Sequence, residues 1–394
     1  MPLIKEKSPH VRLCIVNPTR TTTNSVPGVI SDEAREMATK VASVHVIVFG
    51  TGRPNVIKLS HNALLHTVPF QMPENHLRFP TFAIGQLRTF SIVLKVVLRS
   101  DVNLIRADDP ILTGLVAAVI SKSCRLPFVL FLGGNPAEIA RVKLRFSNTR
   151  VVQRTLMLSL IRLLQRIVIR LSDLVITVNE ELAAMSQQLG AKQVLIVEPY
   201  LDLRKFVPAA KPEGRRFRVM YVGRLEPEKG ILDLLAAARS LASENIEFVI
   251  AGGGSLAPAL NFATRSQADL SKVRLLGPVN HDAMPELYHQ ADVVVLPSYT
   301  EGAPVAVFEA MASGCPVVAT RVGNLPTLFR DEVEIMFVAT ADPQDLASKL
   351  RTLCVNDNLR KELVRNAWLK TSNLFGSYLE AHIKSYSRLI SAMR

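Results

Sequence analysis

Two glutamates with seven residues between them, Glu301 and Glu309, flank the start of an apolar segment that follows Gly302 and Pro304. The apolar run Val293–Leu296 comes just before them, so the stretch is typical of a strand, a loop and a helix. Amides at a helix N-terminus bind anions such as phosphate, whereas carboxylates accept hydrogen bonds from hydroxyl groups. The stretch therefore predicts a ligand that carries both phosphate and sugar. The helix dipole alone also favours a glutamate here, and a second one further along can simply be solvated.

Two cations follow another strand-like run, Phe217–Val222. Gly223 permits a tight turn, and Arg224 and Lys229 come after it, where the two side chains can converge on one anion. A diphosphate leaving group would need such neutralisation. The triplet Gly252–Gly254 also follows a strand-like run, but it lacks the third glycine of a dinucleotide-binding fingerprint, so it indicates close backbone approach and not an NAD site.

Elements that could position these residues alternate along the chain. Strand-like runs alternate with helical ones, such as the helix predicted over Ser31–Ser43, which favours the α/β class with doubly wound parallel sheets. A length of 394 residues indicates two domains, and the segment Tyr200–Gly214 loses its periodicity like a linker. We place the first domain at residues 1–200 and the second at 201–374. Ligands of such sheets bind at the C-terminal ends of the strands.

The charge of the chain is concentrated in its first half. The net charge is +13, and residues 1–200 hold 24 Lys and Arg against 13 Asp and Glu. This field predicts an anionic partner, which could be a membrane surface, a nucleic acid or a phosphorylated substrate. Aromatic residues make up only 6% and are not interleaved with the bases, so nucleic acid is not expected.

Other compositional features bear on where the chain acts. Four scattered cysteines, no signal peptide pattern and no stretch of about 20 uncharged residues favour a cytosolic protein without a transmembrane helix. No cluster of carboxylates and histidines has ligand spacing, so no metal is expected.

Residues 141–171 form a basic, apolar segment without any acidic residue. Four arginines of the segment Val151–Leu171 step in multiples of four and share one broad face of a predicted helix: Arg154, Arg162, Arg166 and Arg170. A basic amphipathic helix is typical of contact with an anionic membrane surface. The alternative is a domain helix with a solvated arginine face.

The second domain resembles the nucleotide-sugar-binding half of retaining glycosyltransferases of the GT-B fold, of the family-4 type (glycosyltransferase group 1). The resemblance covers residues 217–330 and rests on the loops named above, on Leu276–Val279 and on the block from Ala291 to Thr320. It implies two Rossmann-like domains facing a central cleft. It also implies that residues 375–394 form a helix that crosses back to the first domain.

The resemblance also implies roles for single residues. Arg224 and Lys229 would neutralise the diphosphate, Glu301 would contact hydroxyls of the donor sugar, and these three would be the catalytic residues. Glu309 would accept from the ribose hydroxyls. The remaining donor-binding positions would be Gly223, Gly253, Val279, Gly302, Ala303, Pro304 and Val305. The nucleoside diphosphate sugar, of UDP or GDP, is a substrate, so no cofactor is implied.

The first domain departs from the family pattern. Candidate acceptor-side residues, which follow its strand-like runs, are Gly28, Asp108, Gly133 and Asn135. Family members often carry a histidine where this chain has Gly133, which leaves open a non-catalytic protein that binds a sugar nucleotide.

Together these features predict a hexosyltransferase-type enzyme. It would work at the inner face of the plasma membrane on a lipid-linked or other carbohydrate acceptor, in the synthesis of cell-surface polysaccharide or glycolipid. A phosphorylase, or a transferase acting on a soluble acceptor, is the alternative within the enzyme class.

Overall fold

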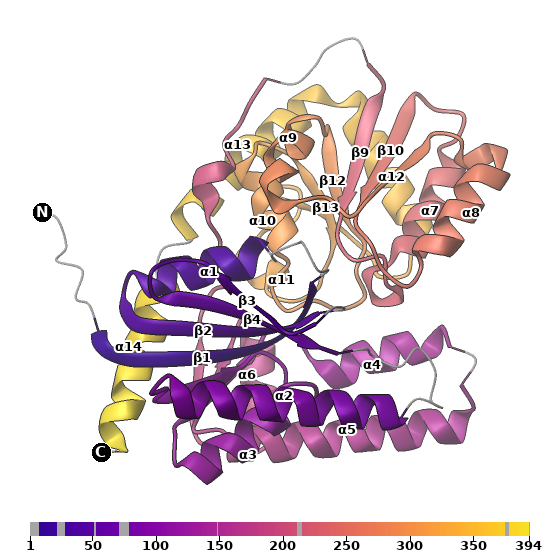
Figure 1. Cartoon of the computed structure of the whole chain (residues 1–394). Coiled ribbons are helices and arrows are strands. Elements are labelled where there is room, and N and C mark those ends of the chain that lie inside the picture. The colour runs from indigo at the N-terminus through magenta and orange to yellow at the C-terminus, as the bar shows by residue number, and fades with distance from the viewer. Residues whose placement is uncertain are drawn as a thin grey trace, which may run out of the picture. The chain divides into compact units, whose positions relative to one another are not determined.

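The computed structural model divides the chain into two α/β units (Figure 1). It describes residues 8–21, 28–50, 53–70, 79–147, 149–210, 215–374 and 378–393. Unit 1 comprises Met1–Ala137, Val152–Tyr200 and Ser377–Arg394, and unit 2 comprises Glu138–Val151 and Leu201–Gly376. Each unit contains one largely parallel sheet, which confirms the predicted α/β class.

Unit 1 has an eight-stranded sheet in the order β3-β4-β2-β1-β5-β6-β7-β8, in which only the β3–β4 pair is antiparallel. The strands are β1 (Ser8–Thr21), β2 (Val41–Gly50), β3 (Asn55–Lys58), β4 (Ala63–Pro69), β5 (Leu104–Ala107), β6 (Phe128–Leu132), β7 (Leu174–Thr177) and β8 (Val194–Ile196). The helices described with them are α1 (Gly28–Ala38), α2 (Phe79–Arg99), α3 (Gly114–Cys124), α5 (Val151–Leu171), α6 (Glu180–Gln188) and α14 (Tyr378–Ala392). The helix α4 (Pro136–Arg145) begins in unit 1, and from Glu138 onward it belongs to unit 2. Two apolar clusters cover the two faces of this sheet, so its central strands are apolar on both sides.

The helix predicted over Ser31–Ser43 is wrong in its C-terminal part. α1 ends at Ala38, and β2 begins at Val41. The amide of Asn62 donates to the carbonyls of Ala38, at 2.8 Å, and of Val41, at 3.1 Å, which supports the turn between helix and strand. Val41, a β-branched residue, begins the strand, and tertiary packing in the sheet outweighs the local helical pattern.

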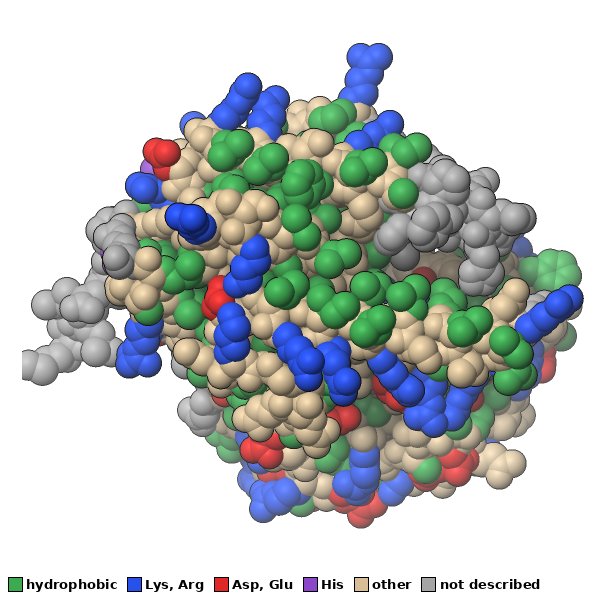
Figure 2. Space-filling view, turned by 90° about the horizontal axis from the view of Figure 1, so that it is seen from below, with side chains coloured by type: hydrophobic (Ala, Val, Ile, Leu, Met, Phe, Trp, Pro, Cys, Tyr) green, Lys and Arg blue, Asp and Glu red, His purple; other side chains and the backbone are tan. Residues whose placement is uncertain are grey.

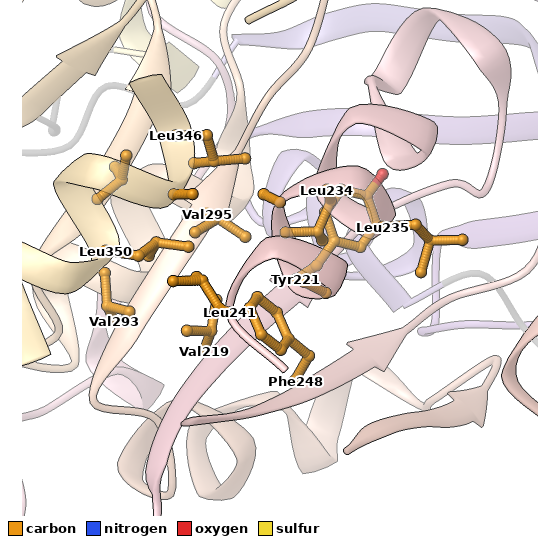
Figure 3. Close-up of a cluster of buried hydrophobic side chains, with 14 of the residues drawn as sticks. Val219, Tyr221, Leu234, Leu235, Leu241, Phe248, Val293, Val295, Leu346 and Leu350 are labelled. Atoms are coloured by element: carbon orange, nitrogen blue, oxygen red, sulfur yellow. The ribbon is translucent and has the colours of Figure 1, made fainter. Parts of the chain in front are cut away.

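Unit 2 has a six-stranded parallel sheet in the order β11-β10-β9-β12-β13-β14. The strands are β9 (Phe217–Val222), β10 (Ile246–Ala251), β11 (Val273–Gly277), β12 (Val293–Leu296), β13 (Val317–Thr320) and β14 (Met336–Val338). The helices are α7 (Ile231–Ser240), α8 (Ala257–Ser266), α9 (Met284–His289), α10 (Val305–Ala312), α11 (Leu325–Leu328), α12 (Pro343–Val355) and α13 (Asp357–Leu374). On one face of the sheet, Figure 3 shows leucines of α7 and α12 packed against residues of β9, β10 and β12.

The C-terminal helix α14 belongs to unit 1 and joins a buried polar network there. Arg106 on β5 donates to Glu33 and to Asp108, at 2.6 Å each, and Tyr378 of α14 donates to Glu33. Burial works to lower the pKa of Arg106, but the two carboxylates raise it well above its ordinary value. Because the charges are buried, loss of Arg106 would leave the two carboxylates uncompensated, at a cost of about 3–5 kcal/mol.

A stacked histidine pair in unit 1 makes stability depend on pH. His45 Nδ1 of β2 lies 3.0 Å from His66 Nε2 of β4, and burial, with a further contribution from His45, lowers the pKa of His66 to about 4. An unfolded histidine takes up its proton near pH 6.5. The unfolded state therefore binds more protons between pH 6.5 and 4, so the free energy of unfolding falls as pH is lowered through that window.

We predict that the wild-type chain loses about 2 kcal/mol more stability between pH 7.5 and 5 than His66→Gln does. Thermal unfolding at both pH values measures the difference. His61→Gln, which changes an exposed histidine, is the matched control and should behave as the wild type does. An equal loss in His66→Gln and wild type would contradict the assignment.

Candidate active site in unit 2

Loops at the C-terminal ends of β9, β10 and β12 are joined by backbone hydrogen bonds. Leu225 N, after β9, donates to Gly253 O, after β10, at 2.9 Å. Tyr299 N, after β12, donates to Glu228 O at 2.8 Å. The sequence motifs that lie far apart along the chain therefore meet at one edge of the sheet, where α/β folds bind their ligands.

Two glycines are required for this packing. A Cβ atom added to Gly252, which has a φ of 147°, would lie 1.8 Å from Gly223 O. One added to Gly230, with a φ of 65°, would lie 1.9 Å from Pro297 O. Both positions combine a backbone conformation that favours glycine with contacts that exclude a side chain. The interpretation of the Gly252–Gly254 triplet as a place of close backbone approach is consistent with this geometry.

Lys229 and Glu301 form an ion pair at this edge. Lys229 Nζ lies 2.6 Å from Glu301 Oε1, and Ser298 Oγ donates to the same oxygen at 2.8 Å. Both charged side chains are largely buried, with exposed fractions of 16% and 11%. An ammonium has three donors and a carboxylate accepts about four hydrogen bonds, so each group keeps capacity for a ligand.

Arg224 is held by a carboxylate that the sequence analysis did not identify. Arg224 Nη2 lies 3.0 Å from Oε1 of Glu228, whose side chain is 1% exposed while that of Arg224 is 56% exposed. Only the four-residue spacing between an arginine and a glutamate could have indicated this pair. The structure thus places one exposed cation, Arg224, and one enclosed cation, Lys229, after the same strand.

Glu309 is buried on α10 and receives two hydrogen bonds. His281 Nε2 lies 2.7 Å from its Oε1, and the hydroxyl of Tyr288 on α9 donates to its Oε2 at 2.9 Å. Burial, reinforced by the Glu309 charge, raises the pKa of Tyr288 well above its ordinary value, so Tyr288 remains a donor. Neither partner stands in a motif, so sequence spacing gave no signal for them. The carboxylate is fixed in place, and it has more lone pairs than these two hydrogen bonds use.

The helix α10 begins at Val305, directly after Pro304. The amide of Val307 donates to Pro304 O at 3.0 Å, whereas the first two amides of a helix have no acceptor within it, and the helix dipole favours an anion there. Gly302 in the preceding turn accepts from Asn324 N at 3.0 Å, which ties the turn to the loop after β13. Ala303 belongs to the same turn, while Gly253 follows β10 and Val279 follows β11. All predicted donor-binding residues therefore follow the C-terminal ends of neighbouring strands of one sheet.

The predicted acceptor-side residues belong to unit 1. Gly28 is the first residue of α1. Asp108 accepts from Arg106 Nε and from Asn17 Nδ2, so its carboxylate is part of the buried network of that unit. Gly133 is exposed, and a Cβ atom there would meet nothing closer than 3.6 Å, so its backbone position does not demand glycine. Asn135 accepts from Ala137 N at 3.2 Å at the start of α4.

The predicted basic helix is α5, and its arginines differ in their surroundings. Arg154 is half-buried, whereas Arg162, Arg166 and Arg170 are exposed. Arg170 Nε donates to Leu189 O at 3.1 Å. Several apolar residues of α5 are also exposed, and Figure 2, which views this side of unit 1, shows hydrophobic side chains and bases together on the surface.

The described residues contain neither a membrane-spanning helix nor a cluster of metal-binding side chains. No helix among them has the length and apolar character needed to cross a membrane. Within the same described segments, no group of three or more His, Cys, Asp or Glu side chains has an arrangement that could hold a metal ion.

We predict that Tyr288→Phe lowers the free energy of unfolding by roughly 1–3 kcal/mol, because a buried carboxylate oxygen of Glu309 loses its donor. Denaturant unfolding of the full chain measures this loss. The matched control repeats the substitution in a Glu309→Leu background, where the buried hydroxyl has lost its acceptor and its removal should be neutral or stabilising. An equal cost in both backgrounds would show that the hydroxyl stabilises the chain by another route.

The known proteins that this chain resembles are described as glycosyltransferases. The family described as "Glycosyl transferases group 1" matches residues 216–356. A D-inositol 3-phosphate glycosyltransferase of Salinispora arenicola is 34% identical over 201 residues, which is 44% of this chain and 45% of that protein. An uncharacterized glycosyltransferase of Methanocaldococcus jannaschii is 24% identical over 325 residues, covering 82% of this chain and 83% of the relative. The chain spans about half the length of the D-inositol 3-phosphate glycosyltransferases that it matches.

Solved structures resemble the whole chain. A sucrose-phosphate synthase from Thermosynechococcus elongatus has a TM-score of 0.78 at 18% identity and covers 97% of this chain and 100% of its own. The Anabaena protein HepE in complex with UDP-glucose has a TM-score of 0.69 at 17% identity, covering 96% and 99%. At these identities the likeness shows the fold alone.

Proposed function

We propose that this chain is a retaining hexosyltransferase, and the match of residues 216–356 to the group 1 glycosyltransferases and the fold shared with solved glycosyltransferase structures support the proposal. Its donor is a nucleoside diphosphate sugar, and its acceptor is a lipid-linked molecule at the membrane surface. The product enters cell-surface polysaccharide or glycolipid. The chain works from the cytoplasm, held peripherally at the inner face of the plasma membrane.

The observation that carries the proposal is the grouping of Lys229, Glu301 and Glu309 around the start of α10. An enclosed ammonium together with amides at a helix N-terminus is suited to a diphosphate. The two carboxylates, each oriented by its own hydrogen bonds, are suited to hydroxyls of the sugar and of the ribose. Arg224, more exposed than Lys229, supplies a second cation for the same anion.

The chemistry follows from these positions. The bond between the anomeric carbon and the diphosphate oxygen breaks, and negative charge grows on the leaving diphosphate. Lys229, Arg224 and the amides of Gly302, Ala303 and Val305 stabilise that charge in positions that are already ordered, which is where electrostatic catalysis is strongest. The acceptor oxygen bonds to the anomeric carbon on the face that the diphosphate leaves, and its proton passes to a departing phosphate oxygen. No protein base is required, and the anomeric configuration is retained.

We predict that Glu309→Ala weakens binding of UDP or GDP, whichever the chain accepts, by about ten- to a hundredfold, because charge-assisted hydrogen bonds worth roughly 1.5–3 kcal/mol are lost. A thermal-shift titration measures this, since a ligand at a hundred times its dissociation constant stabilises by about 2.7 kcal/mol. Glu332→Ala, an exposed glutamate of the same unit, is the control and should bind normally. Unchanged affinity in Glu309→Ala, or no shift with any nucleotide, would contradict the donor assignment and favour a non-catalytic protein.

A soluble acceptor is the second candidate. It is favoured by the relatives named D-inositol 3-phosphate glycosyltransferases, since that name describes a small phosphorylated acceptor. The exposed apolar residues of α5 favour the membrane instead. Leu156 and Leu160 are 66% and 55% exposed and lie on a helix whose charged residues are all arginines. A bilayer with anionic lipids would cover the leucines and attract the arginines at once.

We predict that the full chain binds vesicles of phosphatidylcholine with about 30% phosphatidylglycerol, and that added salt weakens the binding. Leu156→Ser with Leu160→Ser should reduce binding at least tenfold, since burying each leucine contributes about 1.5–3 kcal/mol. The control pair, Phe262→Ser with Val355→Ser, removes exposed apolar residues of unit 2 and should leave binding unchanged. Vesicle flotation measures both. An equal loss of vesicle binding in the two double variants, or no vesicle binding by the wild type, would favour the soluble acceptor.

A further inference from the structure

A cavity of about 470 Å³ lies in unit 1 between the start of α4, the middle of α5 and the C-terminal part of α6. Asn135 lines it from the loop after β6, Arg162 and Arg166 line it from α5, and Met185 and Leu189 line it from the α6 side. The volume is in the range of small-molecule sites. The exposed side chains of the two arginines make the cavity accessible from solvent.

The lining of this cavity combines cations with apolar surface. No acidic residue lines it, so the positive charge of Arg162 and Arg166 is not balanced within the wall. A guanidinium matches the geometry of phosphate oxygens with two parallel hydrogen bonds. The charge and the shape therefore suit an anion.

Gln165 gives an independent indication of a polar ligand. This side chain lines the cavity and is 2% exposed. Among the described residues its amide donates only to the thioether sulfur of Met185, at 3.2 Å, and a thioether is a weak acceptor. A phosphate oxygen in the cavity would be a stronger acceptor for the same donor.

An apolar strip continues from the cavity along α5. Leu156, Leu160, Leu163 and Ile167 follow helical spacing, and their side chains are 66%, 55%, 54% and 38% exposed. Leu163 belongs both to this strip and to the cavity wall. Figure 2 shows such hydrophobic side chains interspersed with bases on this side of unit 1. A molecule with its anionic group in the cavity could thus lay an apolar chain along the strip.

We propose that the cavity binds the phosphate group of an anionic lipid whose hydrocarbon chain covers the strip on α5. This inference rests on the proposed function and specifies the acceptor as a lipid phosphate or diphosphate. The cavity begins at Asn135, directly after the Gly133–Gly134 turn at the C-terminal end of β6, and that end of a strand is where a doubly wound sheet presents ligands. The cavity joins the lipid-facing helix to this edge of the sheet.

Calorimetric titration of the full chain with geranyl phosphate, geraniol and inorganic phosphate tests the proposal. Geranyl phosphate should bind at least tenfold more tightly than either of the others, because only it satisfies both the arginines and the strip. Inorganic phosphate binding as tightly would overturn the assignment to a lipid. Geraniol binding as tightly would overturn the role of the arginines.

Variants distinguish binding in the cavity from attraction to the general positive charge of the surface. Arg162→Gln with Arg166→Gln should weaken geranyl phosphate at least tenfold. The matched control, Lys95→Gln with Arg99→Gln, removes two exposed charges of α2 outside the cavity and should change the affinity less than about twofold. Ser159→Trp, which places a large side chain in the cavity and keeps both arginines, should also weaken binding at least tenfold. Equal effects of the two charge pairs, or full affinity in Ser159→Trp, would overturn the proposal.

The titration contains no sugar nucleotide, so its outcome is independent of the transferase assignment. UDP or GDP binding in unit 2 is measured on each variant and should be unchanged, which also shows that the variants are folded. Sugar transfer to a soluble acceptor by a chain that binds geranyl phosphate would refute the lipid acceptor while leaving the cavity assignment intact. If the double variant Arg162→Gln with Arg166→Gln transferred sugar to a lipid phosphate as well as the wild type does, the assignment of the cavity as the lipid phosphate site would be refuted, while the lipid acceptor would stand.

Discussion

Close approach of backbone to backbone at the carboxyl ends of β9, β10 and β12 is the constraint on which the site in unit 2 depends. Gly252 packs on the carbonyl of Gly223, and Gly230 packs on that of Pro297, with no space for a Cβ atom at either contact. Parallel strands bring these loops to one edge, and glycine lets them come close enough to act together. The loop after β9 and the loop after β12 are thereby close enough for Lys229 to donate a hydrogen bond to Glu301.

Three carboxylates at this edge are oriented by donors, each in a different way. Glu301 receives an ammonium and a hydroxyl, Glu309 receives an imidazole and a phenol, and Glu228 faces the guanidinium of Arg224. Buried carboxylates without such partners would be costly. The same hydrogen bonds that make burial tolerable fix the directions of the remaining lone pairs, which is the preorganisation that the proposed sugar transfer needs.

Unit 1 uses its charges differently. Arg106 and Asp108 are buried in a network that also includes Tyr378 of the C-terminal helix, so these charges stabilise the packing of α14. The arginines of α5 remain at the surface beside exposed leucines. The buried charges of unit 1 and its exposed charges thus have separate roles.

The sequence by itself determined the α/β class and the strands Phe217–Val222 and Val293–Leu296, because apolar runs and glycine turns are local signals. It predicted that Glu309 matters but not that His281 and Tyr288 hold it, and it gave no sign that Asp108 is buried against Arg106. Those partners are distant or outside any motif. Only the tertiary structure decided them, because hydrogen-bond partners of buried charges are set by how helices pack on the sheet. The cavity beside α5 was also decided by the tertiary structure. Its wall combines residues from three separate elements, and the sequence does not show that these elements pack together.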